Sequence, residues 1–210
     1  MSTTDVEPTV ELFVDPACPF AWMTSRWLLH AAEVREIAPR FRVMSLAVLN
    51  EGRDLDPDYR RSTDQSWGAA RLAIHIARTE GDEAFARWYT AWGERYHVGG
   101  QKEDRRATAV AALEDAGLPA GLIDAYDPAD GDDTDRALRA SHQDAIDMVG
   151  DDVGTPVISF GEGTAYFGPV VSPAPKGEEA GRLLDGLRAL ASVQGFYELK
   201  RSRTGGIDLS

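Results

Sequence analysis

The pattern of apolar and polar positions predicts two strands and a helix near the N-terminus. Residues 9–14 (TVELFV) form a short apolar run without a helical period, and a turn signal follows it. After Cys18, apolar side chains recur at helical spacing, and Pro19 suits the first turn of a helix because its missing N–H needs no partner there. Residues 41–49 form a second strand-like run. This order of strand, helix and strand predicts the start of a βαβ unit.

Residues 58–150 lack strand character, and their apolar side chains follow a helical period. The acidic residues 132–135 suit the first turn of the last helix in this segment. The segment is therefore predicted to be an all-helical insertion. Its three apolar stripes are Trp67, Ala70, Ile74 and Ala77; Phe85, Trp88, Trp92 and Tyr96; and Leu138, Ser141, Ala145 and Met148.

Strand character returns after the insertion. Residues 155–160 predict a third strand, and residues 164–170 complete a hairpin after a glycine-containing turn at 161–163. A last helix is predicted over residues 177–193. The layout is an α/β fold in which a helical insertion separates a βαβ half from a ββα half. The predicted domain is residues 1–57 with 151–210, and the predicted insertion subdomain is residues 58–150.

Charge and composition narrow the class of partner. The 210 residues include 35 Asp and Glu against 22 Lys and Arg, for a formal net charge of −13, so a nucleic-acid partner is not expected. No apolar run approaches the roughly 18 residues that cross a bilayer, and the N-terminus carries acids and no apolar signal segment. We therefore expect a cytoplasmic protein without a membrane partner.

The single cysteine, Cys18, excludes an internal disulfide and a site built from several thiolates, and we expect no metal. A lone cysteine is most often a small buried hydrophobe. This one follows a strand and precedes a helix, where free N–H groups and the helix dipole favour a thiolate. The position predicts a moderately depressed pKa and a nucleophilic thiol, although Asp15 would oppose that shift if it lies close.

Thr155-Pro156 opens the third predicted strand. Proline is normally excluded from a central strand, so it marks either an ordinary trans bond at the start of the strand or a cis bond. Base rates favour the trans form.

Several segments together resemble the DsbA-like branch of the thioredoxin superfamily, and more closely the actinobacterial mycothiol-dependent nitroreductase family. The resemblance extends from residue 13 to residue 203. The segments that carry it are Asp15–Trp22 (DPACPFAW), Trp22–Trp27 (WMTSRW), Val43–Glu51 (VMSLAVLNE), Asp152–Pro156 (DVGTP), Phe167–Val170 (FGPV), Gly177–Gly181 (GEEAG) and Phe196–Arg201 (FYELKR).

The resemblance implies a DsbA-like thioredoxin fold, mycothiol as the low-molecular-weight thiol co-substrate, and often a homodimer. It implies that Cys18 is the nucleophile and that Phe20 replaces the Trp of a C-P-W-C-type motif. Thr155 and Pro156 match a cis-proline loop beside the nucleophile. The implied substrate- and thiol-binding residues are Pro19, Phe20, Ala21, Trp22, Asn50, Tyr59, His97, Thr155 and Pro156. For three of these a structural reading also stands: a turn Asn50, a packed Tyr59 and a solvated His97 at a helix end.

Ala21 stands where dithiol members of this family have a second, resolving cysteine. A mixed disulfide at Cys18 must then be resolved by an external thiol, which favours monothiol chemistry. The leading hypothesis is a monothiol oxidoreductase that uses mycothiol and reduces a small electrophile such as a nitro compound. Two alternatives remain open: a thiol-conjugating transferase or isomerase, and a non-catalytic binding or sensing protein.

Overall fold

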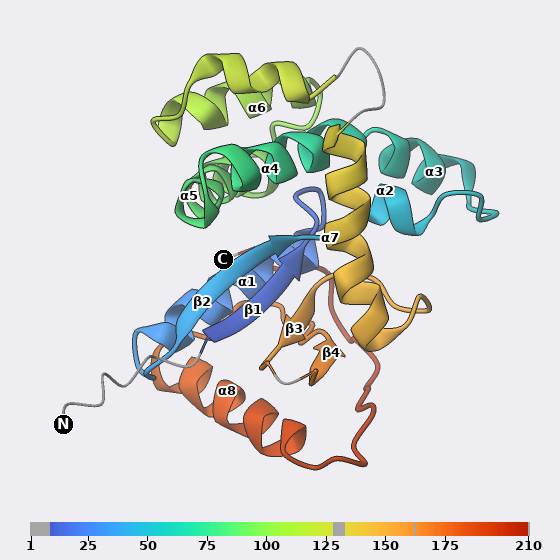
Figure 1. The fold of residues 1–210 in the computed structure, drawn as a ribbon. Helices are drawn as coiled ribbons and strands as arrows, with labels where there is room; N and C mark the ends of the chain where they lie inside the picture. Colours follow the sequence, from blue (N-terminus) through green and yellow to red (C-terminus); the bar gives the residue numbers. More distant parts are fainter. Residues whose placement is uncertain (1–8, 128–132, 162, 210) are drawn as a thin grey trace.

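A four-stranded mixed sheet stands at the centre of the computed structural model, which describes residues 9–127, 133–161 and 163–209 (Figure 1). Strands β1 and β2 run parallel, whereas β3 is antiparallel to β1 and β4 is antiparallel to β3, in the order β2-β1-β3-β4. The predicted βαβ and ββα halves are therefore confirmed. The strands are β1 (Thr9–Val14), β2 (Ala38–Val43), β3 (Val157–Ser159) and β4 (Ala165–Phe167).

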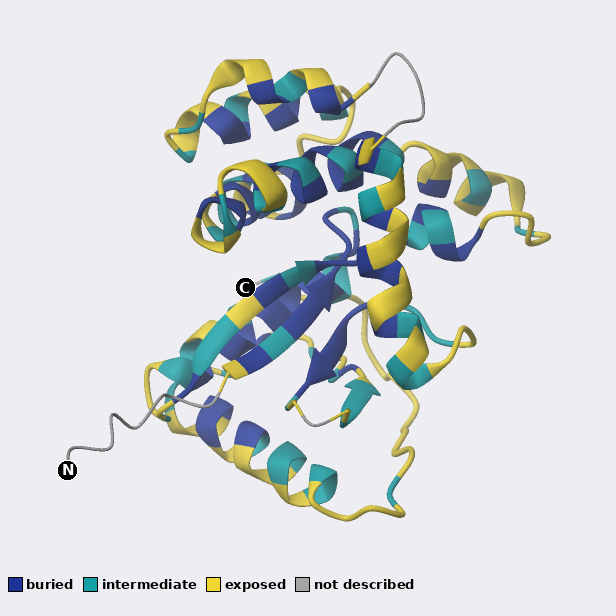
Figure 2. Ribbon diagram, in the orientation of Figure 1, coloured by how far each residue is buried: buried dark blue, intermediate teal, exposed yellow. Residues whose placement is uncertain are grey.

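Helices cover both faces of the sheet. Helix α1 (Pro19–Ala32) and helix α8 (Gly177–Ala191) pack together on one face, and α7 (Asp133–Val149) lies against β2 and β4. Side chains alternate along β1, so Leu12 belongs to the main core while Phe13 packs in a smaller cluster with Ala145 of α7. Burial on both faces explains why β1 reads as a continuous apolar run, as Figure 2 shows.

The connection between β2 and β3 is helical wherever the structure describes it. Figure 1 shows α4, α5 and α6 together beyond the carboxyl ends of β1 and β2. The first predicted stripe lies on α4, the second runs through α5 into the π-helical segment η1, and the third lies on α7. Position 132 and the turn residue 162 lie outside the described residues, and the subdomain boundaries stay a prediction. The elements are α2 (Leu46–Leu49), α3 (Pro57–Asp64), α4 (Trp67–Thr79), α5 (Asp82–Gly93), η1 (Glu94–Val98), α6 (Arg105–Asp115) and the 3₁₀ helix η2 (Ala120–Ala125).

One predicted element is wrong. Residues 41–49 were expected to continue as a strand, but β2 ends at Val43 and a short helix, α2, follows. Ser45 caps this helix by accepting a hydrogen bond from the Val48 N–H (3.3 Å), and the Asp15 carboxylate accepts one from the Leu46 N–H (2.6 Å). A tertiary contact from the end of β1 thus outweighs the strand pattern.

Helices α4, α5 and α6 together with η1, which we call the helical layer, meet α1 at a position where only glycine fits. A Cβ atom on Gly93, at the end of α5, would lie 2.1 Å from the ring of Trp22. Trp22 is buried, and its ring also meets Tyr89 edge-on with 5.9 Å between centroids. This close contact places α5 and η1 directly over the first turn of α1.

None of the described helices is both long and apolar enough to cross a membrane.

Candidate active site around Cys18

Cys18 lies at the N-cap of α1, where the sequence predicts the helix to begin. Its N–H donates to the Asp15 carbonyl (3.0 Å), and its own carbonyl accepts from the Trp22 N–H (3.1 Å). The thiol donates a hydrogen bond to the carbonyl oxygen of Thr155, with 3.4 Å between sulfur and oxygen. Only 6% of the residue is exposed. The sulfur is therefore fixed between the helix N-terminus and the loop before β3.

The expected depressed pKa of Cys18 is contradicted. Burial, with a contribution from the negative charge of Asp15, raises the pKa of the thiol to about 12, although the N–H groups of Ala21 and Phe20 act to lower it. The helix N-terminus acts in the expected direction but is outweighed by desolvation. In this conformation Cys18 carries its proton at neutral pH.

Alkylation measures this protection directly, because the chain has one cysteine. At pH 7.5, iodoacetamide should modify the folded protein at least about tenfold more slowly than the urea-unfolded chain, whose thiol has a pKa of about 8.5. The loss of free thiol is followed by intact mass in both states. A folded-state rate equal to or above the unfolded rate would restore the prediction of an activated thiolate.

Asp15 joins three parts of the site. Its side chain is fully buried and accepts hydrogen bonds from the N–H groups of Ala17 (2.7 Å) and Leu46 (2.6 Å). Its own N–H donates to the Thr155 hydroxyl (3.2 Å). Burial raises the pKa of Asp15 to about 6, although both N–H bonds and the charge of Arg105 lower it. One carboxylate thus connects the Cys18 turn, the start of α2 and the loop before β3.

The loop before β3 presents its backbone to the thiol. The Thr155-Pro156 peptide bond is cis, and so are Gly168-Pro169 and Ser172-Pro173. Thr155 is buried and its hydroxyl donates a long hydrogen bond to the Phe13 carbonyl (3.4 Å), while the Pro156 carbonyl accepts from the Gly168 N–H (2.8 Å). The predicted pair at 155 and 156 and the predicted nucleophile are therefore brought together.

Aromatic side chains from the helical layer cover the other side of the Cys18 turn. The Pro16 carbonyl accepts hydrogen bonds from Trp92 Nε1 (2.7 Å) and from His97 Nε2 (3.0 Å). The His97 ring stacks on Trp22 with 6.0 Å between centroids. Burial lowers the pKa of His97 to about 4, so the ring is neutral with its proton on Nε2. His97 is therefore buried against the Cys18 turn, and the alternative of a solvated histidine is wrong.

Asn50 and Tyr59 are placed differently. The Asn50 amide donates to the Leu46 carbonyl (2.8 Å) and so closes α2. Tyr59 lies on α3 with 47% of the residue exposed. Within the described residues, no hydrogen bond joins either side chain to the Cys18 turn. Their role in binding stays a prediction.

Sequence reasoning missed several residues that meet at this site. Trp92 was predicted only as a core position, and Arg105 was not singled out. Arg26 of α1 is half-buried, with its guanidinium 4.1 Å from the centre of the Trp22 ring. The sequence offers one signal for such residues: a carboxylate directly after a buried strand, as at Asp15, has little access to water.

Within the described residues, no group of three or more His, Cys, Asp and Glu side chains is arranged to hold a metal ion.

Comparison with known proteins places the chain in a family. The family model described as Rv2466c-like, mycothiol-dependent nitroreductase Rv2466c, matches residues 17–201. The chain belongs to the Rv2466c-like family. The matched range includes Cys18, the loop that carries Thr155-Pro156, and the helical layer. The protein is therefore a thiol-dependent oxidoreductase. A relative from Mycobacterium tuberculosis (strain ATCC 25618 / H37Rv), Rv2286c, is 32% identical over 198 residues, which cover 93% of this chain and 83% of the relative.

Solved structures show the same fold. A probable DsbA oxidoreductase, SCO1869 from Streptomyces coelicolor, is 18% identical with a TM-score of 0.53, covering 96% of this chain and 94% of that one. The cytosolic disulfide reductase DsbM from Pseudomonas aeruginosa, solved with GSH, is 16% identical with a TM-score of 0.53, covering 86% and 99%. At these sequence identities the comparison supports the fold alone. The predicted DsbA-like thioredoxin fold is thereby confirmed.

Proposed function

We propose that this member of the family works with one protein thiol, and that Cys18 forms a mixed disulfide with a low-molecular-weight thiol. The observation that carries the proposal is the bond from the Cys18 thiol to the Thr155 carbonyl, at 3.4 Å. A carbonyl in that place can pair with the backbone of a bound thiol compound while the sulfur atoms react. The name of the family supports mycothiol as that thiol.

The exchange proceeds in two steps. Cys18 loses its proton to solvent, and the thiolate attacks one sulfur of a disulfide, so that a new S–S bond forms and the other sulfur leaves as a thiolate. Ala21 offers no second protein thiol. A second external thiol then attacks the mixed disulfide, restores the Cys18 thiolate and carries away the released disulfide. These two steps consume one external thiol and release one half of the substrate disulfide as a thiolate, and a further external thiol that attacks the product disulfide completes the two-electron reduction.

The burial of Cys18 requires that the reactive conformation is more open than the one described here. Trp92 and His97 hold the helical layer on the Pro16 carbonyl through two hydrogen bonds. Separation of this layer from the turn admits water to the sulfur and lowers the desolvation that raises its pKa. A thiol substrate enters along the same path.

A mycothiol moiety fits the chemistry of the groups around this path. Mycothiol is a neutral thiol with amide and sugar hydroxyl groups, which need hydrogen-bond donors and acceptors. Two buried nitrogen atoms near the turn, His97 Nδ1 and Arg105 Nε, have no hydrogen-bond partner among the described residues. His97 Nδ1 can accept a hydrogen bond and Arg105 Nε can donate one, so each suits a hydroxyl or amide group.

The mixed disulfide is tested by mass. After incubation with oxidised mycothiol, the folded protein should gain one mycothiol moiety, and excess reduced mycothiol should remove it. Oxidised glutathione, supplied side by side, should give at least about tenfold less adduct at equal time. Cys18→Ser should give none with either thiol. Absence of any adduct on the wild-type chain under conditions that support turnover would favour a transferase, in which the bound thiol is activated without a covalent link.

A further inference from the structure

Three cations around the Cys18 site stand without an ion pair, although the chain has an excess of acids. Arg71, for example, is paired with Asp135 at 2.6 Å. Lys102, Arg105 and Arg203 form no salt bridge within the described part of the chain. We call these three residues the cationic rim. Other Lys and Arg residues also lack a salt bridge, so what distinguishes these three is their position over aromatic rings beside the Cys18 turn.

Lys102 and Arg105 share one aromatic ring beside the site. The Lys102 ammonium and the Arg105 guanidinium each lie 5.5 Å from the centre of the Tyr96 ring. Tyr96 stacks on Trp92 with 4.7 Å between centroids, and Trp92 donates to the Pro16 carbonyl. Arg105 is also close enough to Asp15 to lower the pKa of that buried carboxyl. The charge of Arg105 therefore acts on the turn that carries Cys18, and the charge of Lys102 acts on His97, which bonds to that turn.

The acids near this pair are engaged elsewhere. Lys102 and Arg105 line a cavity of about 560 Å³, which Asp64, Asp104 and Asp127 also border. Asp64 pairs with Arg60 (3.4 Å), Asp104 accepts from the Ala107 N–H (2.9 Å) at the start of α6, and Asp127 pairs with Arg106 (3.5 Å). Glu103 and Asp104 are the two lining carboxylates without an ion pair in the described residues. Arg105 Nε remains a buried donor without a partner there.

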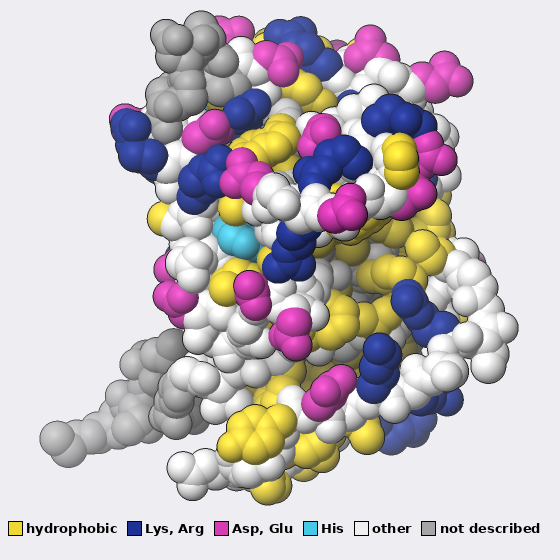
Figure 3. Space-filling view, turned by 90° about the vertical axis from the view of Figure 1, so that its right-hand side faces the viewer, with side chains coloured by type: hydrophobic (Ala, Val, Ile, Leu, Met, Phe, Trp, Pro, Cys, Tyr) yellow, Lys and Arg dark blue, Asp and Glu magenta, His cyan; other side chains and the backbone are white. Residues whose placement is uncertain are grey.

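The third cation comes from the C-terminal segment, which we define as residues 196–209. The Arg203 guanidinium lies 4.7 Å from the centre of the ring of Phe20, two residues after Cys18. The segment is fixed at both ends, because Tyr166 donates to the Phe196 carbonyl (3.1 Å) and the Asp208 N–H donates to the Ser172 hydroxyl (2.7 Å). Figure 3 shows the molecule hollowed between the helical layer and this segment, with hydrophobic side chains on the floor and Lys and Arg side chains beside it.

We propose that the electrophile attacked by Cys18 is an anion, with its carboxylate or similar acidic group held by Lys102, Arg105 and Arg203. This inference rests on Cys18 as the nucleophile of the proposed function and adds the charge of the substrate. The chain as a whole repels anions, but that repulsion is screened beyond about 8 Å at physiological salt. Cations over aromatic rings at the rim of a cleft act locally and are screened less. In the exchange described above, this anion is the substrate disulfide: the Cys18 thiolate attacks one of its sulfur atoms and the other half leaves as a thiolate. Mycothiol, a neutral thiol, then attacks the mixed disulfide, forms a disulfide with the bound half and restores the Cys18 thiolate.

Two alkylating reagents that differ in charge test this proposal. Iodoacetate and iodoacetamide both form an S–C bond at Cys18, release iodide and leave the thiol proton to solvent. The chain has one cysteine, so every modification reports on Cys18. The ratio of the iodoacetate rate to the iodoacetamide rate should be at least about threefold higher for the folded protein than for the urea-unfolded chain. Added salt should reduce the difference, because it screens the charges.

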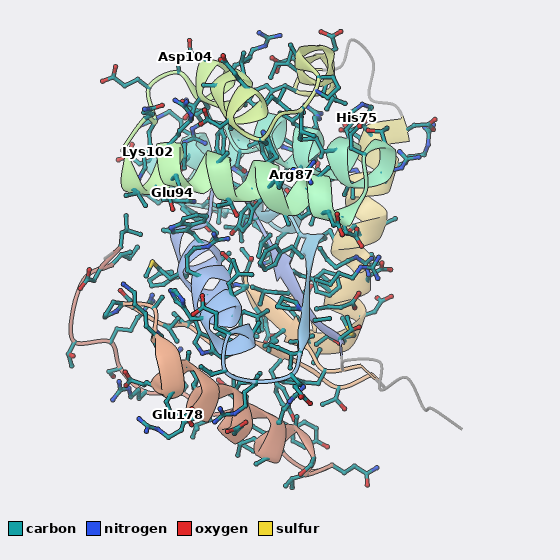
Figure 4. All side chains as sticks on the ribbon, turned by 90° about the vertical axis from the view of Figure 1, so that its left-hand side faces the viewer. His75, Arg87, Glu94, Lys102, Asp104 and Glu178 are labelled. Carbon is teal, nitrogen blue, oxygen red and sulfur yellow. The ribbon has the colours of Figure 1, made fainter. Side chains whose placement is uncertain are left out.

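Single variants locate the effect. Lys102→Gln, Arg105→Gln and Arg203→Gln should each lower the folded-state ratio about two- to fivefold, which corresponds to the loss of one nearby charge in a partly aqueous site. Arg87→Gln is the matched control: Arg87 is exposed on α5, and Figure 4 shows it well separated from Lys102. Lys102 and Arg203 are exposed, so their variants keep the test available if Arg105→Gln fails to fold.

The outcomes separate this inference from the proposed function. A folded-state ratio equal to or below that of the unfolded chain overturns the anionic electrophile, whether or not Cys18 forms a mixed disulfide with mycothiol. A ratio that responds to Arg87→Gln as strongly as to the rim variants also overturns it, because the effect then reflects total charge. If the folded protein has a raised ratio of iodoacetate to iodoacetamide rates but forms no mixed disulfide, the preference for anions is supported and the monothiol mechanism is wrong.

Discussion

Replacing Cys18 by Ala should abolish thiol-dependent turnover, with a loss of at least about a thousandfold in kcat. The reason is chemical: within the chain there is one sulfur that can form a disulfide, and it lies at 3.4 Å from the Thr155 carbonyl. The rate is measured as NADPH consumption in an assay that couples the oxidised mycothiol to its reductase. Cys18→Ser removes the nucleophilic thiol and retains a small polar side chain at the N-cap.

The control for folding is the stability of both variants in urea. Cys18 is almost fully buried, but Ala and Ser are smaller and fit the same space, so each should unfold cooperatively with a cost of about 1–2 kcal/mol. If Cys18→Ala keeps a substantial part of the wild-type rate, the covalent mechanism is wrong. The protein would then activate a bound thiol without forming a bond to it, as the transferase alternative requires.

The fold was largely predictable because its core patterns are local. The apolar run of β1, the helical period after Cys18 and the stripe Phe85, Trp88, Trp92 and Tyr96 each describe one element and the face it buries. The strand predicted at 41–49 failed where a distant group decides the backbone. The Asp15 carboxylate and the Ser45 hydroxyl cap α2, and no apolar pattern reports a side chain that approaches from another strand.

The site was predictable only in part, for the same reason. Cys18 and Thr155 follow from their positions beside a helix start and a strand start. The pKa of Cys18 does not, because it depends on how completely α5, η1 and the loop before β3 remove water from the sulfur. His97 and Arg105 reach the Cys18 turn from the helical layer, more than 75 residues further along the chain. Such contacts depend on how the helical layer packs against the Cys18 turn, and no local pattern in the sequence indicates them.

Stability should depend on pH through Asp15. The pKa of this carboxyl is about 6 in the folded protein and close to 3.8 in the unfolded chain, so the folded state binds the proton more tightly between these values. The stabilisation from that proton is complete below about pH 4 and is lost as the pH rises through 6. The difference corresponds to about 3 kcal/mol, an order-of-magnitude value from about 1.4 kcal/mol per pKa unit.

The measurement compares wild type with Asp15→Asn in urea denaturation between pH 4 and pH 7. Subtracting the free energy of unfolding of the variant removes the titration of the other carboxylates, and the difference should fall by about 2 kcal/mol over this range. Asp124→Asn, at an exposed carboxylate on η2, should show no such change relative to wild type. A difference that rises with pH would mean that the two N–H bonds to Asp15 outweigh its desolvation.

The sign of this dependence also bears on the thiol. Above about pH 6 the Asp15 carboxylate is charged, and this charge raises the pKa of Cys18. The same group holds the Cys18 turn to α2 and, through its N–H, to Thr155. Asp15→Asn keeps the side-chain shape but removes the charge, so in this variant the pH profile of Cys18 alkylation should shift to lower pH. A shift in the opposite direction would show that loss of the turn geometry, and deeper burial of the sulfur, outweighs the loss of charge.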